Sequence, residues 1–137
     1  RYDGLIEELG GKPAPSIGFA MGIERLLLLV SEYGSLEVNA APDVYAMHQG
    51  EGADLQVMKY AQALRAQGFN VMQHSGYQSL KAQMKKADNS GARFALIVAQ
   101  DELVNGTVTL KDMQGKREQQ TVAAADLTDT LQQWKNA

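Results

Sequence analysis

The chain has 137 residues, no cysteine, two histidines and a formal net charge of −3, with 45% apolar and 21% charged residues. This composition is typical of a soluble globular protein, and the length allows one domain, or one domain and a remnant of another. It excludes a disulfide framework and a thiolate metal site, and its longest apolar run, 26–30, is far shorter than the ~20 residues of a membrane span.

The first part of the chain is predicted to contain two helices. A short helix is expected at 4–9, ended by a glycine pair, and a longer one at about 23–33. Apolar residues cover much of the circumference of the longer helix, so we expect it to be well buried, although this piece alone would lack the cover for that surface. The segment 34–42 has turn residues at both ends and few large side chains, which is typical of a linker.

A strand is expected between these helices, at 18–23, where small and large apolar residues alternate. The alternating segment reads Gly18-Phe19-Ala20-Met21-Gly22-Ile23. Successive side chains of a strand point to opposite faces, so one face is bare backbone on which a flat ligand can lie. Arg25 follows directly, and its guanidinium can stack on a ring or clamp a phosphate. The alternative for Arg25 is a surface residue paired with Glu24 or Glu32.

From residue 43 onward, strand and helix patterns alternate. Strands are expected at 43–48, 69–74, 94–99, 107–113 and 118–122, and helices at about 53–67, 79–89 and 124–135. This order predicts an α/β domain whose sheet is parallel at its centre and antiparallel at one edge. The expected buried stripes of the three helices are Leu55, Met58, Ala61 and Leu64; Leu80, Met84 and Ala87; and Leu127, Leu131 and Trp134.

The helix at 79–89 carries the candidate RNA-binding residues. Lys81 and Lys85 lie one turn apart, with Gln83 and Lys86 reaching around from them, and Tyr77 in the preceding loop can stack on a base. Residues 42–137 are neutral overall, but 81–93 hold four basic residues against one acidic. Phosphate contacts depend on such local patches. The alternative is an ordinary solvated helix face.

The two histidines, His48 and His74, each end an expected strand. Such residues are more often surface or satisfied core histidines than functional groups, so no role is assigned to them. They are too few for a histidine metal site, and no metal ligand is predicted in this chain.

Four segments carry a resemblance to a known family. The stretch 18–25 is similar to the third signature motif of class II aminoacyl-tRNA synthetases, and Arg1-Tyr2-Asp3-Gly4-Leu5 resembles the end of a signature of histidyl-tRNA synthetases. The resemblance continues through 79–88 and 91–97 and covers essentially the whole chain. It is specific to bacterial-type histidyl-tRNA synthetases.

The resemblance implies two parts and a role for each. Residues 1–41 would be the C-terminal remnant of the class II catalytic core with a linker, and 42–137 an anticodon-binding domain with a mixed five-stranded sheet flanked by helices. It implies that Gly18, Ala20 and Gly22 form the ATP adenosine platform, that the catalytic Arg25 binds the ATP phosphates and that Tyr2 lies in the histidine pocket. The expected tRNA contacts are Tyr77, Lys81, Gln83, Lys85 and Lys86.

The activity implied is histidine–tRNA ligation. The intact enzyme would activate histidine with ATP and Mg²⁺ and transfer it to tRNA(His), as a cytoplasmic homodimer without membrane contact. Because the chain starts at Arg1 directly on a motif, we expect it to be a piece of a longer protein, with the Mg²⁺ ligands in the missing part and no activity of its own.

Two alternatives remain open. The first is the synthetase-like regulatory subunit of histidine biosynthesis, which has no ligase activity, although such paralogues usually lack an anticodon domain. The second treats 42–137 as an α/β domain that binds a small molecule or a protein and no RNA.

Overall fold

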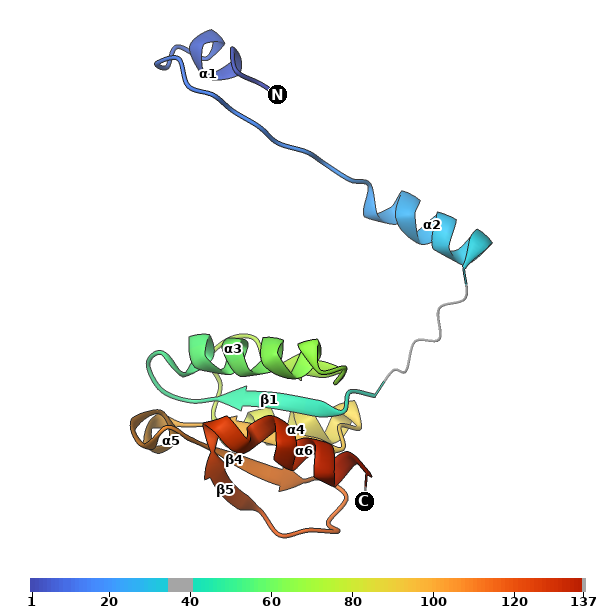
Figure 1. Ribbon diagram of the computed structural model, residues 1–137, viewed down its shortest axis with the longest axis vertical. Coiled ribbons are helices and arrows are strands. Elements are labelled where there is room, and N and C mark those ends of the chain that lie inside the picture. The colour runs from blue at the N-terminus through green and yellow to red at the C-terminus, as the bar shows by residue number, and fades with distance from the viewer. Residues whose placement is uncertain (35–40, 137) are drawn as a thin grey trace. The chain divides into compact units, whose positions relative to one another are not determined.

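The computed structural model describes residues 1–34 and 41–136 and divides the chain into two units, residues 1–38 and 39–137 (Figure 1). Most of the expected linker, 34–42, lies outside the described residues. All strand pairings among the described residues belong to the second unit.

The described part of the first unit is helical where helices were expected. Helix α1 spans Leu5–Glu8 and α2 spans Ile23–Tyr33. The strand expected at 18–23 is not formed: residues 14–22 follow an extended path without strand pairing (Figure 1). A strand needs a neighbour to bond its backbone groups, and no strand exists within residues 1–34 to supply one.

Helix α2 is not buried in this structure, as expected for this piece alone. None of its residues is buried, and four consecutive leucines, Leu26 to Leu29, are between 45% and 68% exposed. Leucines on successive positions point around the whole helix, and this pattern normally belongs to a helix covered on several sides. The described residues of this unit supply no such cover.

The second unit is an α/β domain built on one mixed sheet. Its elements are β1 (Val44–His48), α3 (Ala53–Ala66), β2 (Val71–Gln73), α4 (Leu80–Ser90), β3 (Phe94–Val98), α5 (Gln100–Asn105), β4 (Thr107–Asp112), β5 (Gln120–Ala123), the short 3₁₀ turn η1 (Ala124–Asp126) and α6 (Leu127–Asn136). The strand order is β2-β1-β3-β4-β5. Strand β1 pairs in parallel with β2 and β3, and β4 pairs antiparallel with β3 and β5. The predicted fold class, a five-stranded mixed sheet flanked by helices, is confirmed.

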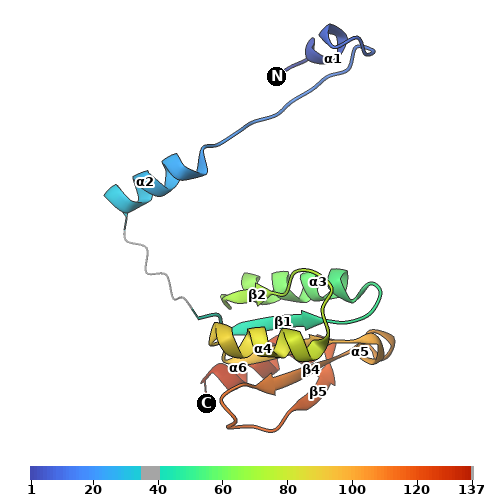
Figure 2. The ribbon, with the colours of Figure 1, turned by 180° about the vertical axis from the view of Figure 1, so that it is seen from behind.

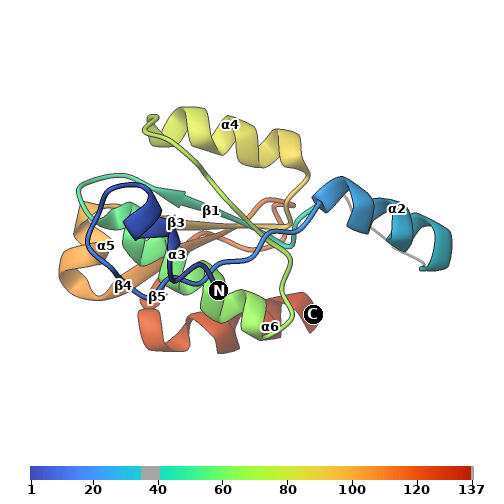
Figure 3. The same ribbon diagram turned by 90° about the horizontal axis from the view of Figure 1, so that it is seen from above.

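Helices cover the sheet on both faces. Figure 3 shows α4 on one side and α3 with α6 on the other, so that α6 is in front in Figure 1 and α4 in Figure 2. The core on the α3 and α6 side includes Val44, Ala46, Leu64, Leu96, Leu110, Leu131 and Trp134. The core on the α4 side includes Tyr45, Met47, Ala87, Ala95 and Ile97. Strands β1 and β3 are buried on both faces, which explains their nearly continuous apolar sequences.

The buried stripe of α3 differs from the predicted one. The buried residues are Ala53, Val57, Ala61 and Leu64, whereas Leu55 is 54% exposed and Met58 48% exposed. At about 3.6 residues per turn, a repeat of three drifts ~60° backward at each step, so a stripe at 55, 58, 61 and 64 turns halfway around the helix. The observed spacing of four, four and three stays on one face.

Helix α5 was not predicted. It occupies six residues between β3 and β4, and the carboxylate of Glu102 accepts hydrogen bonds from the Ala99 N–H at 2.9 Å and the Thr109 hydroxyl at 2.7 Å. Gly106 then ends the helix in a left-handed conformation, φ 65°. A helix this short has no apolar periodicity, so only Glu102 and Gly106 could have indicated it.

A pair of matched substitutions tests the observed register of α3. Leu64→Ala removes a fully buried side chain, and we expect it to lower the free energy of unfolding by about 2–5 kcal/mol. Leu55→Ala makes the same change at an exposed position of the same helix and should cost less than about 1 kcal/mol. Urea unfolding followed by circular dichroism measures both. Equal losses would contradict the register.

Candidate nucleic-acid interface

The candidate interface is built on α4 and the loop before it. The helix begins at Ser79, whose hydroxyl accepts a hydrogen bond from the Ala82 N–H at 3.4 Å. Lys81, Lys85 and Lys86 are all exposed. Three ammonium groups on one helix can neutralise phosphates that approach from solvent. The structure therefore brings the predicted cations together on one accessible helix.

Tyr77 lies in the loop and is 87% exposed. Its ring meets the His48 ring edge-on, with a centroid separation of 6.4 Å and an interplanar angle of 85°. One face of the aromatic ring is thus open to solvent, while the edge contact with His48 supports it. An exposed aromatic in the loop before a lysine-bearing helix is a suitable platform for an unstacked base.

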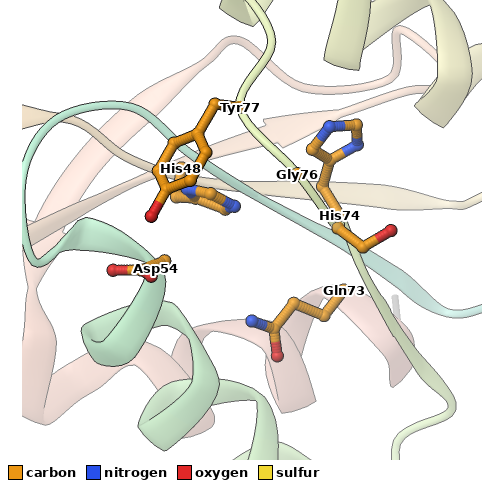
Figure 4. A pocket seen from close by; sticks show the side chains of 7 residues that line it. His48, Asp54, Gln73, His74, Gly76 and Tyr77 are labelled. Atoms are coloured by element: carbon orange, nitrogen blue, oxygen red, sulfur yellow. The ribbon is translucent and has the colours of Figure 1, made fainter.

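Two hollows adjoin Tyr77 and His48. One, of about 400 Å³, is lined by His48, Asp54, Gln73, His74, Ser75, Gly76 and Tyr77. The other, of about 330 Å³, is lined by His48, Gln49, Gly50, Tyr77, Gln78 and Ser79. Figure 4 shows Tyr77 over His48 with its hydroxyl end on the side of Asp54, which lies on α3, whereas the imidazole of His74 is turned away from Asp54. The polar lining can bond the edges of a base.

A third hollow of about 500 Å³ runs along α4 and is more apolar. Leu80, Met84 and Ile97 line it together with Lys81, Lys85 and Asp88. An apolar floor edged by lysines can accept a flat ring whose phosphate reaches the ammonium groups.

Gln83 was predicted to contact RNA, and its burial removes it from the candidate contacts. Its side chain is fully buried. The amide bonds the backbone of His48 and Gln78. The prediction failed because helix position 83 falls on the same side as Ala87, which packs against the sheet.

The two histidines, for which the sequence suggested no role, are buried core residues. His48 is 5% exposed and His74 3% exposed. Nδ1 of His74 lies 3.0 Å from the Tyr45 hydroxyl, and its Nε2 has no hydrogen-bond partner among the described residues. Burial, followed by the positive charges of Lys86 and His48, lowers the pKa of His74. The imidazole is therefore neutral at physiological pH.

The nucleotide-site residues predicted in the first unit are exposed. Gly18, Ala20, Gly22, Arg25 and Tyr2 all face solvent. Tyr2 donates its backbone N–H to the Ser16 carbonyl at 2.9 Å, and a Cβ at Gly18 would stand 3.6 Å from the Tyr2 ring. The structure thus brings Tyr2 beside the first residue of the small-residue segment. Arg25 lies in the first turn of α2.

The part of the chain that the structure describes contains no group of three or more His, Cys, Asp or Glu suited to a metal ion. None of its helices combines the length and apolar character that crossing a bilayer requires.

Comparison with known proteins agrees with this geometry. A family model described as an anticodon binding domain matches residues 43–134. The chain belongs to the anticodon binding domain family. This match runs from β1 into α6 and includes α4 with its lysines.

The chain is similar to histidine–tRNA ligases. It is 96% identical over 137 residues to that of Neisseria meningitidis serogroup A, covering 100% of this chain and 32% of that protein. It is 53% identical over 131 residues to that of Laribacter hongkongensis, covering 96% of this chain and 31% of that protein. The structure of apo S. aureus histidyl-tRNA synthetase matches with a TM-score of 0.61 and 33% identity, covering 95% of this chain and 33% of that chain. The resemblance to histidyl-tRNA synthetases is confirmed, and the chain spans about a third of the length of these curated relatives.

The neutral state of His74 predicts an acid-sensitive stability. The lowered pKa means that, as the pH falls below about 6.5, the unfolded state binds a proton before the folded state does. The stability contributed by neutral His74 is thus complete above the unfolded pKa and is lost as the pH falls through the folded pKa. We expect the free energy of unfolding to fall between pH 7.5 and 5.5 in urea titrations.

The control is His74→Gln, which keeps a partner for Tyr45 but does not titrate. Its stability should fall less over the same range. An unchanged pH slope in this variant would show that other groups cause the acid sensitivity.

Proposed function

We propose that the second unit binds the anticodon arm of tRNA(His), as part of a histidine–tRNA ligase. The observation that carries this proposal is the grouping of Lys81, Lys85, Lys86 and Tyr77 on α4 and its preceding loop, within an anticodon binding domain. The lysines neutralise backbone phosphates, and Tyr77 stacks on an unstacked loop base. The near-identical histidine–tRNA ligase relatives support tRNA(His) as the RNA.

The first unit contributes to the catalytic core in this proposal. Residues 1–41 form part of the core and 42–137 the anticodon-binding domain. Gly18, Ala20 and Gly22 lie under the adenosine of ATP, Arg25 binds its phosphates and Tyr2 bonds the substrate histidine. The exposed apolar side chains of α2 support this assignment, because a helix of this kind normally packs against more protein.

The chemistry follows from these roles. The carboxylate of histidine attacks the α-phosphorus of ATP and displaces pyrophosphate. The acyl group of the histidyl-adenylate then passes to a hydroxyl at the 3′ end of the tRNA, and AMP is released. Mg²⁺ accompanies ATP, and the full-length enzyme works as a homodimer in the cytoplasm. The chain's own contribution is to position substrates and offset phosphate charge, which requires no protein nucleophile.

Salt-dependent binding tests the RNA interface. Replacing Lys81 and Lys85 together by alanine should weaken binding to a histidine-tRNA anticodon stem-loop and flatten the plot of log affinity against log salt. The slope should fall by about one unit for each phosphate that the variant no longer neutralises. Fluorescence anisotropy at several salt concentrations measures it.

The matched control is Lys59→Ala with Lys116→Ala, which removes two exposed lysines outside α4. That double variant should keep the wild-type slope. A wild-type slope in the Lys81/Lys85 variant would place the RNA on another surface.

Arg25→Ala in the full-length enzyme tests the nucleotide site. Loss of a cation that meets the ATP phosphates should reduce histidine-dependent pyrophosphate exchange by about 10²-fold or more, with tRNA affinity nearly unchanged. Lys12→Ala removes another exposed cation of the same unit and should have little effect. Normal exchange in the Arg25 variant would refute its assignment.

A further inference from the structure

The side chain of Gln83 joins three parts of the second unit. Its Oε1 accepts the backbone N–H of His48 at 3.1 Å. Its Nε2 donates to the backbone carbonyl of His48 at 2.7 Å and to that of Gln78 at 2.7 Å. Because both N–H groups of the amide are used and the side chain is fully buried, this is a completely satisfied interior contact.

The Gln83 amide bonds β1 just beyond the last residue of β1 that pairs with β2. The Val44 N–H donates to the Asn70 carbonyl at 3.1 Å, and the Ala46 carbonyl accepts the His74 N–H at 2.8 Å. In a parallel sheet every second residue directs its backbone groups to the same side, so His48 is next to face β2. The paired register ends at Ala46 and Gln73, however. The Gln83 amide supplies the donor and acceptor that a longer β2 would have supplied.

The third hydrogen bond fixes the loop that carries Tyr77. Gln78 follows Tyr77 directly and precedes Ser79, which begins α4. The bond from Gln83 to the Gln78 carbonyl therefore links this loop to the end of β1, where His48 supports the Tyr77 ring. An apolar side chain at position 83 would leave the buried N–H and carbonyl of His48 unpaired, at a cost of about 1–3 kcal/mol for each group, and would release the part-buried Gln78 carbonyl.

We propose that Gln83 is a positioning residue for RNA binding, which holds the 74–79 loop and the first turn of α4 in the conformation that presents Tyr77 and Lys81. The inference rests on the proposed function. Gln83 touches no RNA itself; it acts through the loop and through the end of β1. Its loss should therefore reduce affinity by lowering the population of the binding-competent loop.

Two variants distinguish the effect of losing the Gln83 hydrogen bonds from the effect of adding a charge. Gln83→Met has a similar length and no charge, and it removes all three bonds. Gln83→Glu keeps an acceptor for the His48 N–H but places a carboxylate against two carbonyl groups. For both variants at pH 7.5 we expect faster amide exchange in the 74–79 loop and about tenfold weaker binding of the anticodon stem-loop. A tenfold loss of affinity follows if the binding-competent loop conformation falls to about a tenth of its population.

Lowering the pH should partly restore the RNA affinity of the Gln83→Glu variant. A buried carboxyl beside two carbonyls has a raised pKa, and its protonated form can donate to one of them. The affinity of Gln83→Glu relative to wild type should therefore recover between pH 7.5 and 5.5, while that of Gln83→Met should not. The titratable groups around this contact are Tyr45 and His48 on β1, Asp54 on α3, His74 and Tyr77 after β2, and Lys81, Lys85 and Lys86 on α4. All are shared by the compared chains, so their titration cancels to first order in the ratio.

Gln62→Glu is the charge control. It adds a carboxylate at an exposed position of α3, outside α4 and the loop before it, and leaves the Gln83 amide in place. Its loss of affinity should be small, should be screened by salt and should leave loop exchange unchanged. The Gln83→Met defect should persist at high salt.

A direct measurement on the wild-type chain remains if the variants do not fold. The His48 amide should exchange slowly and show a scalar coupling through its hydrogen bond to the side-chain carbonyl carbon of Gln83. Absence of both would overturn the proposal, as would full affinity in a Gln83→Met chain that folds. If the wild-type chain itself does not bind the stem-loop, the proposed function is wrong and the positioning role is wrong with it. Absence of the His48 hydrogen bond, or full affinity in a folded Gln83→Met chain, would rule out the positioning role alone.

Discussion

The second unit depends on burying β1 and β3 between two layers of helices. Both strands are covered on each face, by α3 and α6 on one side and by α4 on the other. Buried strands can carry few polar side chains, because each would need a partner in the core. The groups able to meet a ligand are consequently confined to helix surfaces and to the loops that follow strand ends. The lysines of α4, Tyr77 and the hollows around His48 all lie in such places.

The sequence predicted the order of elements well because their periodicities are simple. Strand β3 is a continuous apolar run, and Leu127, Leu131 and Trp134 keep to one face of α6, so both were located correctly. The predicted stripe of α3 was right at Ala61 and Leu64 and wrong at Leu55 and Met58, because the buried face carries the smaller Ala53 and Val57 in the first turns. Helix α5 was missed because six residues are too few for an apolar periodicity, and its only local signals are Glu102, which accepts the Ala99 N–H, and Gly106.

The site was predicted less completely than the fold, for a related reason. Exposed cations such as Lys81 and Lys85 can be recognised from charge and helical spacing alone. The burial of Gln83 cannot, because the unpaired backbone of His48 exists only where β2 ends short of β1. The burial of His74 likewise depends on Tyr45, which lies 29 positions away. For the first unit, the small-residue alternation at 18–22 was visible, but a strand forms only beside another strand.

The two faces of α4 show how interior contacts can govern a surface. Positions 83 and 87 face the sheet, and positions 81 and 85 face solvent, as helical geometry requires for residues two apart. A cationic surface on a neutral unit gains selectivity mainly through the placement of its charges, because the overall field adds little long-range attraction. A lysine has a long, mobile side chain, so its placement depends on the backbone that carries it. Since the Gln83 amide fixes that backbone at the start of the helix, a neutral buried group sets where the positive charges and Tyr77 can meet an RNA.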